Sequence, residues 1–96
     1  MSLVFSDDSR FIIKGHITDS EDQPLVKAVV EAGQGIKQEA RTRTDESGYY
    51  EFELLNPVDV IVVSTYDANY KRDQEMIVDG PFNTTDTVDI IFYPTQ

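Results

Sequence analysis

Hydrophobic and polar positions alternate along most of this chain, in short runs that are separated by clusters of turn-forming residues. Runs of this kind, at spacings of about 8 to 12 residues, are typical of an all-β sandwich or barrel. No segment shows the period of an amphipathic helix. The pattern predicts seven strands, over residues 11–18, 26–32, 36–44, 49–54, 58–66, 71–79 and 87–93.

In the clearest of these runs, alternate positions are apolar or small, which marks the face that turns toward a core. The run at 58–66 is the most apolar and predicts a central strand, whereas the polar run at 36–44 predicts an edge strand protected by charge. The predicted inward positions are Phe11, Ile13, Gly15 and Ile17, then Ala28, Val30 and Ala32, then Tyr50, Phe52 and Leu54, and finally Val88, Ile90 and Phe92.

Three pieces of the first half follow one another in a recognisable order, at residues 13–19, 23–30 and 42–52. They are a strand with a central Gly15, a second strand that begins Pro-Leu and continues Ala-x-Val, and a Thr-Asp-x-x-Gly-x-Tyr-x-Phe hairpin around Asp45 and Gly48. This pattern resembles the carboxypeptidase regulatory-like domains, also called prealbumin-like or transthyretin-like domains. The resemblance implies a seven-stranded Ig-like or prealbumin-like β-sandwich of Greek-key type, with little or no helix.

A chain of 96 residues is the size of one compact domain, because single domains usually take about 100–150 residues. The composition, 40% hydrophobic and 27% charged, is that of a chain that folds around a core. We expect residues 10–96 to form a single β-sandwich domain. Residues 1–9 are expected to be a tag scar followed by a flexible N-terminal segment.

The charge balance excludes some classes of partner. Eighteen acids against eight bases leave a formal net charge of −10, so nucleic acid and anionic lipid are not expected partners, and the charge favours cationic ones. Residues 49–96 carry nine acids and two bases, while residues 1–48 carry nine acids and six bases. The later half is therefore where the sequence points first for a partner surface.

Several kinds of chemistry are excluded or disfavoured by residue types. The absence of cysteine rules out disulfides, thiolate zinc sites and thiol nucleophiles. No apolar run approaches the roughly 20 residues of a membrane-spanning helix, so direct membrane insertion is not expected. His16 is the single histidine, on the polar face of its strand, and no nucleophile-elbow pattern surrounds any serine. We predict no catalytic residue and no cofactor.

Two groups of residues remain as candidate binding sites. Acids in two turns could supply oxygen ligands to Ca²⁺, although their spacing is not that of an EF-hand and turn acids are more often solvated. Aromatic residues outside the core could form a sugar-stacking face, although Tyr is common on half-exposed strand faces. The acids are Asp19, Glu21, Asp22, Asp45 and Glu46, and the aromatic residues are Tyr49, Tyr66, Tyr70, Phe82 and Tyr93.

The function expected first is that of a non-catalytic accessory or interaction module, which binds a protein partner or a fused neighbouring domain. The resemblance implies an extracytoplasmic location, at the cell surface, in the periplasm or secreted. The expected state is a monomer or a weak edge-strand dimer. Two alternatives stay open, a carbohydrate-binding module that uses the aromatic face and a small hydrolase that uses His16 as its base.

Overall fold

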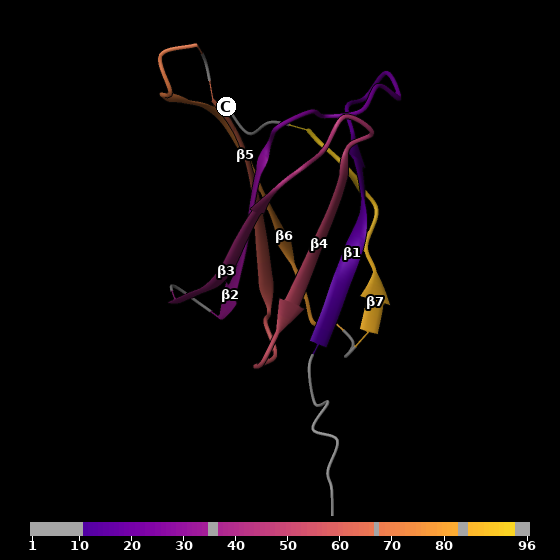
Figure 1. Ribbon diagram of the computed structural model, residues 1–96, viewed down its shortest axis with the longest axis vertical. Coiled ribbons are helices and arrows are strands. Elements are labelled where there is room, and N and C mark those ends of the chain that lie inside the picture. The colour runs from indigo at the N-terminus through magenta and orange to yellow at the C-terminus, as the bar shows by residue number, and fades with distance from the viewer. Residues whose placement is uncertain (1–10, 35–36, 67, 83–84, 94–96) are drawn as a thin grey trace, which may run out of the picture.

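The computed structural model describes residues 11–34, 37–66, 68–82 and 85–93, and within them all regular secondary structure is β-strand. No helix in this described part is long and apolar enough to cross a membrane. The N-terminal segment predicted at residues 1–9 lies outside the described residues. The strands, drawn in Figure 1, are β1 (Phe11–Thr18), β2 (Val29–Gln34), β3 (Lys37–Arg43), β4 (Tyr49–Leu54), β5 (Val60–Tyr66), β6 (Arg72–Asp79), β7 (Thr85–Thr87) and β8 (Ile90–Ile91).

The strands form two sheets that face each other as a sandwich (Figure 1). In the first sheet, β1 pairs antiparallel with β4 and parallel with both β7 and β8. The second sheet has the order β3-β2-β5-β6, with all neighbours antiparallel. The predicted all-β sandwich is therefore confirmed, with β5 in the interior of its sheet and β3 at an edge, as the hydrophobic pattern predicted.

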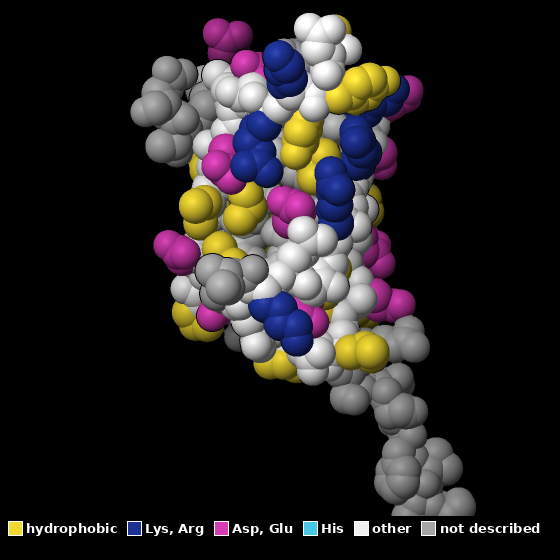
Figure 2. Space-filling view, turned by 90° about the vertical axis from the view of Figure 1, so that its left-hand side faces the viewer, with side chains coloured by type: hydrophobic (Ala, Val, Ile, Leu, Met, Phe, Trp, Pro, Cys, Tyr) yellow, Lys and Arg dark blue, Asp and Glu magenta, His cyan; other side chains and the backbone are white. Residues whose placement is uncertain are grey.

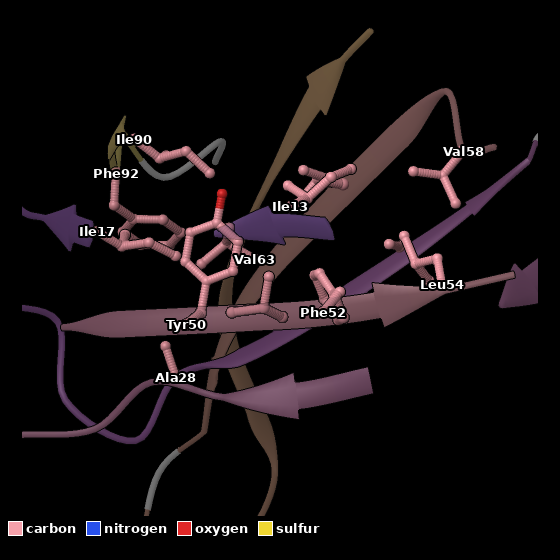
Figure 3. Close-up of a cluster of buried hydrophobic side chains, with 13 residues drawn as sticks. Ile13, Ile17, Ala28, Tyr50, Phe52, Leu54, Val58, Val63, Ile90 and Phe92 are labelled. Atoms are coloured by element: carbon pink, nitrogen blue, oxygen red, sulfur yellow. The ribbon is translucent and has the colours of Figure 1, made fainter. Parts of the chain in front are cut away.

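The core lies between the two sheets and is built from the alternate positions that the sequence marks (Figure 3). Ile13, Ile17, Val30 and Phe52 are all buried in it, because successive residues of a strand point to opposite faces. Tyr50 is 1% exposed, and its hydroxyl donates a hydrogen bond to the Val88 carbonyl at 2.6 Å. The inward faces predicted for β1, β2 and β4 are confirmed.

In place of the last predicted strand, 87–93, the structure has two short strands, β7 and β8, so the described residues form eight strands and not seven. The interruption at Val88 and Asp89 lies across Gly15, where a Cβ atom would be 2.1 Å from the Val88 carbonyl oxygen. The Asp89 carboxylate accepts a hydrogen bond from the His16 amide at 2.9 Å. A side-chain oxygen thus replaces the backbone carbonyl that would accept this bond in a regular β-sheet. The inward parity of Ile90 is as predicted.

Two turns explain where β2 and β4 begin. Lys27 has a left-handed backbone, with φ of 59°, so β2 begins at Val29 and not at residue 26 as predicted, because this conformation interrupts a strand. Before β4, the Asp45 carboxylate accepts hydrogen bonds from the amides of Ser47 and Tyr49 at 2.9 and 3.0 Å. Gly48 follows with φ of 80°, a conformation that glycine adopts without steric cost.

Candidate functional site

The outer face of the β3-β2-β5-β6 sheet carries a concentration of charged and apolar side chains. Val29 and Ser64 point outward from this sheet and lie outside the core cluster, yet both are 0% exposed. The longer side chains around them must therefore fold over the sheet. In the order β3, β2, β5, β6, one row across this face is Arg43, Val29, Ser64 and Glu75, and the next is Arg41, Glu31, Val62 and Ile77.

One end of this face opens into a hollow of about 360 Å³, which we call the basic hollow. It lies beyond the point where the pairing of β2 with β5 ends, at Val29 and Ser64. Among the described residues, three cations and no acid line it, although the chain holds 18 acids and 8 bases. Its lining residues are Val26, Lys27, Ala28, Arg41, Arg43, Thr65, Tyr66 and Tyr70.

Thr44 holds in place the segment around Lys27, which forms one wall of the basic hollow. The Thr44 hydroxyl accepts a hydrogen bond from the Ala28 amide at 2.9 Å and donates one to the Leu25 carbonyl at 2.5 Å. The Lys27 amide donates to the Thr44 carbonyl at 3.1 Å. Because Arg43 precedes Thr44 in the chain, the same contacts hold Arg43 beside the Lys27 segment. One cation at the end of β3 and one in the turn before β2 thus line the same hollow.

The opposite wall is formed by the β5-β6 hairpin. Tyr66 is half-buried and hydrogen-bonded to Arg72; this bond, followed by the charge of Glu75, raises the pKa of the Arg72 guanidinium. Arg72 Nη1 lies 3.5 Å from a Glu75 carboxylate oxygen. Tyr70 is 84% exposed and has a left-handed backbone, with φ of 64°. Tyr66 is thus fixed by Arg72, whereas the Tyr70 ring is open to solvent.

A second, smaller hollow of about 180 Å³ continues along the same face, lined among others by Glu31, Lys37, Val60 and Val62. Ile77, paired with Val62 across β5 and β6, is 58% exposed. Figure 2 looks onto this side of the molecule and shows Lys and Arg side chains around hydrophobic ones. The outer face therefore combines exposed apolar area with a cationic hollow, which is the composition of a binding surface.

The structure distributes the five predicted aromatic residues over separate places. It brings Tyr66 and Tyr70 together at the basic hollow. Tyr49 lies on the other sheet, 5.2 Å from the His16 ring between centroids, and donates a hydrogen bond to Glu51 at 2.6 Å that raises the Tyr49 pKa. Phe82 packs against the core, and the Tyr93 amide contacts the Met76 sulfur at 3.2 Å.

The turn acids proposed for Ca²⁺ mainly serve their own turns. Asp19 accepts hydrogen bonds from the amides of Glu21 and Gln23 at 2.8 and 3.0 Å. Asp45 is bonded to the Ser47 hydroxyl and to the Ser47 and Tyr49 amides, and these bonds lower its pKa. In the part of the chain that the structure describes, no group of three or more His, Asp or Glu side chains could hold a metal ion.

His16 is exposed on the outer face of the other sheet, as its strand position predicts. Among the described residues, its ring has no hydrogen bond to a serine, and its neighbour is the ring of Tyr49.

The sequence reasoning missed Lys27, Arg41 and Arg43 as site residues. Arg41 and Arg43 are two apart in a strand, so a shared face could have been predicted from spacing alone. Their meeting with Lys27, Tyr66 and Tyr70 could not, because it depends on which strands are neighbours and on where the β2-β5 pairing ends.

Comparisons with known proteins give a family and a fold. The sequence model of the carboxypeptidase regulatory-like domain matches residues 12–91. A search of the curated proteins finds no match. Among solved structures, the chain is similar to part of a 9R-lipoxygenase from Cyanothece PCC8801, with a TM-score of 0.60 and 15% identity. The match covers 95% of this chain and 18% of the lipoxygenase chain, and at this identity it shows a shared fold only.

Proposed function

Because the chain belongs to the carboxypeptidase regulatory-like domain family, we propose that it is a non-catalytic interaction module that holds a protein partner or a neighbouring domain on the outer face of the β3-β2-β5-β6 sheet. The observation that carries this proposal is the composition of that face. It gathers three cations, and no acid among the described residues, in the lining of one hollow, and it also carries exposed apolar side chains such as Ile77. We place its work outside the cytoplasm, as the family resemblance implies.

The structural neighbour adds support of a limited kind. In the lipoxygenase, a sandwich of this shape occupies 18% of a much longer chain, so the fold is compatible with service as one part of a larger protein. A fold by itself does not carry a function, since one sandwich supports many roles. The proposal therefore depends on the outer face of this particular chain.

A carbohydrate-binding module is the second candidate, and the meeting of Tyr66 with Tyr70 in one hollow favours it. Sugar recognition by stacking requires open ring faces. Tyr70 offers one, but Tyr66 is half-buried and bonded to Arg72. Three cations line the hollow but only one open ring face does, so protein recognition is the better-supported function.

The proposed function can be tested by photo-crosslinking in the cells that produce the protein, with the full-length gene product. A benzophenone amino acid replaces Ile77 on the outer face in one variant and Ile91 on the other sheet in the control. The two isoleucines are a matched pair, 58% and 50% exposed. We expect one adduct of defined mass from position 77 and none from position 91.

A second part of the crosslinking experiment reverses the charge of two arginines on the outer face. Arg41→Glu and Arg43→Glu together should abolish the adduct at position 77 while the purified variant keeps its urea unfolding midpoint. Equal adducts at both positions, or no adduct at position 77, would contradict an interaction through this face.

A further inference from the structure

The cations of the basic hollow are largely unpaired within the described part of the chain. In the described part of the chain, no ion pair joins Lys27 or Arg43 to an acid. Arg41 has one, with Nε 3.9 Å from a carboxylate oxygen of Glu31, at the outer limit for such a pair. An acidic protein that leaves cations uncompensated in one concave place presents a local positive potential there, which favours an anionic ligand.

The backbone of the residues that line the basic hollow is also unusual. Lys27 and Tyr70, on opposite walls, both have left-handed backbones, which cost a residue with a side chain about 1–2 kcal/mol. Such conformations tend to gather at binding sites, where the surrounding structure holds them.

We propose that the basic hollow binds the side-chain carboxylates of a short acidic peptide segment, which belongs to the partner or neighbouring domain of the proposed function. Guanidinium groups match carboxylates because their parallel N–H donors bind both oxygens at once. Arg43 and Arg41 supply such donors, Lys27 adds a point charge, and the Tyr70 ring covers an aliphatic stem. An apolar residue of the same segment reaches Val62 and Ile77 in the next row of the face.

The distribution of charge explains why the segment is short and is not a long polyanion. The two rows that carry Arg43 and Arg41 also carry Glu75 and Glu31, on other strands of the sheet. These acids would repel phosphates or uronates that continue across the sheet. The two sheets pack about 10 Å apart, so the acids on the far outer face lie further away than the Debye length of about 8 Å at physiological salt. The net charge of −10 therefore does not prevent a few carboxylates from binding in the hollow.

The test uses a capped pentapeptide of four glutamates around a central isoleucine, titrated into the ¹⁵N-labelled protein and followed by NMR. Its glutamine counterpart is the matched ligand control. We expect saturable shifts at the amides of the hollow for the glutamate peptide only. Raising the salt from 25 to 300 mM NaCl should weaken binding by about fivefold, because screening acts on partly exposed pairs.

Variants locate the binding. Arg43→Gln should weaken it by about five- to tenfold, the effect of one charge-assisted contact. Lys27→Asn should act similarly, and asparagine tolerates the left-handed backbone at that position. Lys14→Gln, an exposed lysine on the other sheet, is the control and should leave the affinity unchanged. Amide dispersion and the urea midpoint of each variant establish that it is folded.

The proposal would be overturned by peptide shifts outside the hollow, by equal binding of the glutamine peptide, or by affinity that Arg43→Gln and Lys27→Asn leave intact. An oligomer of uronic acids of the same charge that bound as tightly would also overturn it, in favour of an acidic glycan. If Ile77 crosslinks to a partner but the peptide does not bind, only the ligand chemistry fails. If the peptide binds and no adduct forms, the proposed function fails and the carboxylate site stands.

Discussion

Thr44 is the residue whose removal should show most directly how the walls of the basic hollow are held. Its hydroxyl lies between two backbone groups, accepting from the Ala28 amide at 2.9 Å and donating to the Leu25 carbonyl at 2.5 Å. Thr44 is 3% exposed, so water does not replace these bonds. Thr44→Val keeps the shape of the side chain and removes only its hydrogen-bonding capacity.

The expected loss of stability follows from the two bonds. Each contributes about 1 kcal/mol net, and a buried group left without a partner costs about 1–3 kcal/mol. The Ala28 amide is buried, whereas Leu25 is only partly so, and its carbonyl can recover some solvation. We expect Thr44→Val to lower the free energy of unfolding by about 2–4 kcal/mol, out of the roughly 5–14 kcal/mol typical of a chain this long.

The measurement is equilibrium unfolding in urea, with the slope of the transition compared between variants to establish that the unfolded state is the same. Thr44→Ser keeps the hydroxyl and should cost about 1 kcal/mol for the lost methyl. Thr42→Val, two residues earlier and in β3, is the control, because no hydrogen bond of the Thr42 hydroxyl occurs in the described part of the chain. It should stay within about 0.5 kcal/mol of wild type. A Thr44→Val protein as stable as wild type, or a Thr44→Ser protein as unstable as Thr44→Val, would refute this reasoning.

Three other variants test separate features of the fold. Ser64→Ala removes a buried hydroxyl that has no partner among the described residues, so urea unfolding should show unchanged stability or a gain of up to about 1 kcal/mol; a clear loss would mean that the hydroxyl is bonded. Gly15→Ala places a Cβ 2.1 Å from the Val88 carbonyl oxygen and should lower the Tm by about 8 °C or more; an unchanged Tm would contradict the close approach. The pKa of Asp45 is lowered, first by the Ser47 hydroxyl, so its carboxylate stabilises the fold above about pH 4 and this contribution is lost as the pH falls through the lowered pKa. Asp45→Asn should flatten the acid limb of the stability profile, and parallel limbs for the two proteins would exclude this role.

Much of the architecture follows from local patterns in the sequence. The inward parity of β1, β2 and β4 is readable because side chains alternate across a strand, and the burial of Ile13, Val30 and Phe52 agrees with it. The turn at Asp45 and Gly48 is readable because an aspartate acceptor and a glycine with positive φ meet a specific backbone requirement.

The candidate site was much less predictable than the fold. Tyr66 and Tyr70 were expected on a ligand face because they are aromatic and outside the alternation of the core, and the structure does bring them together. No sequence pattern indicated the cations beside them, because the net charge of −10 favours an acidic surface. A total charge is a sum over all faces, and it carries no information about a single hollow.

The sequence alone determined which residues face inward, where one hairpin turns and to which family the chain is similar, since each depends on residues close together in the chain. Only the tertiary structure decided that the last strand breaks where Val88 crosses Gly15, and that Lys27, Arg43 and Tyr70 share one hollow. These features depend on pairings between distant strands, β1 with the C-terminal strands and β2 with β5. Alternation within a run specifies which side chains point inward, but it does not specify which strand lies beside which. The residues of the basic hollow therefore come together only when the strands pair into sheets.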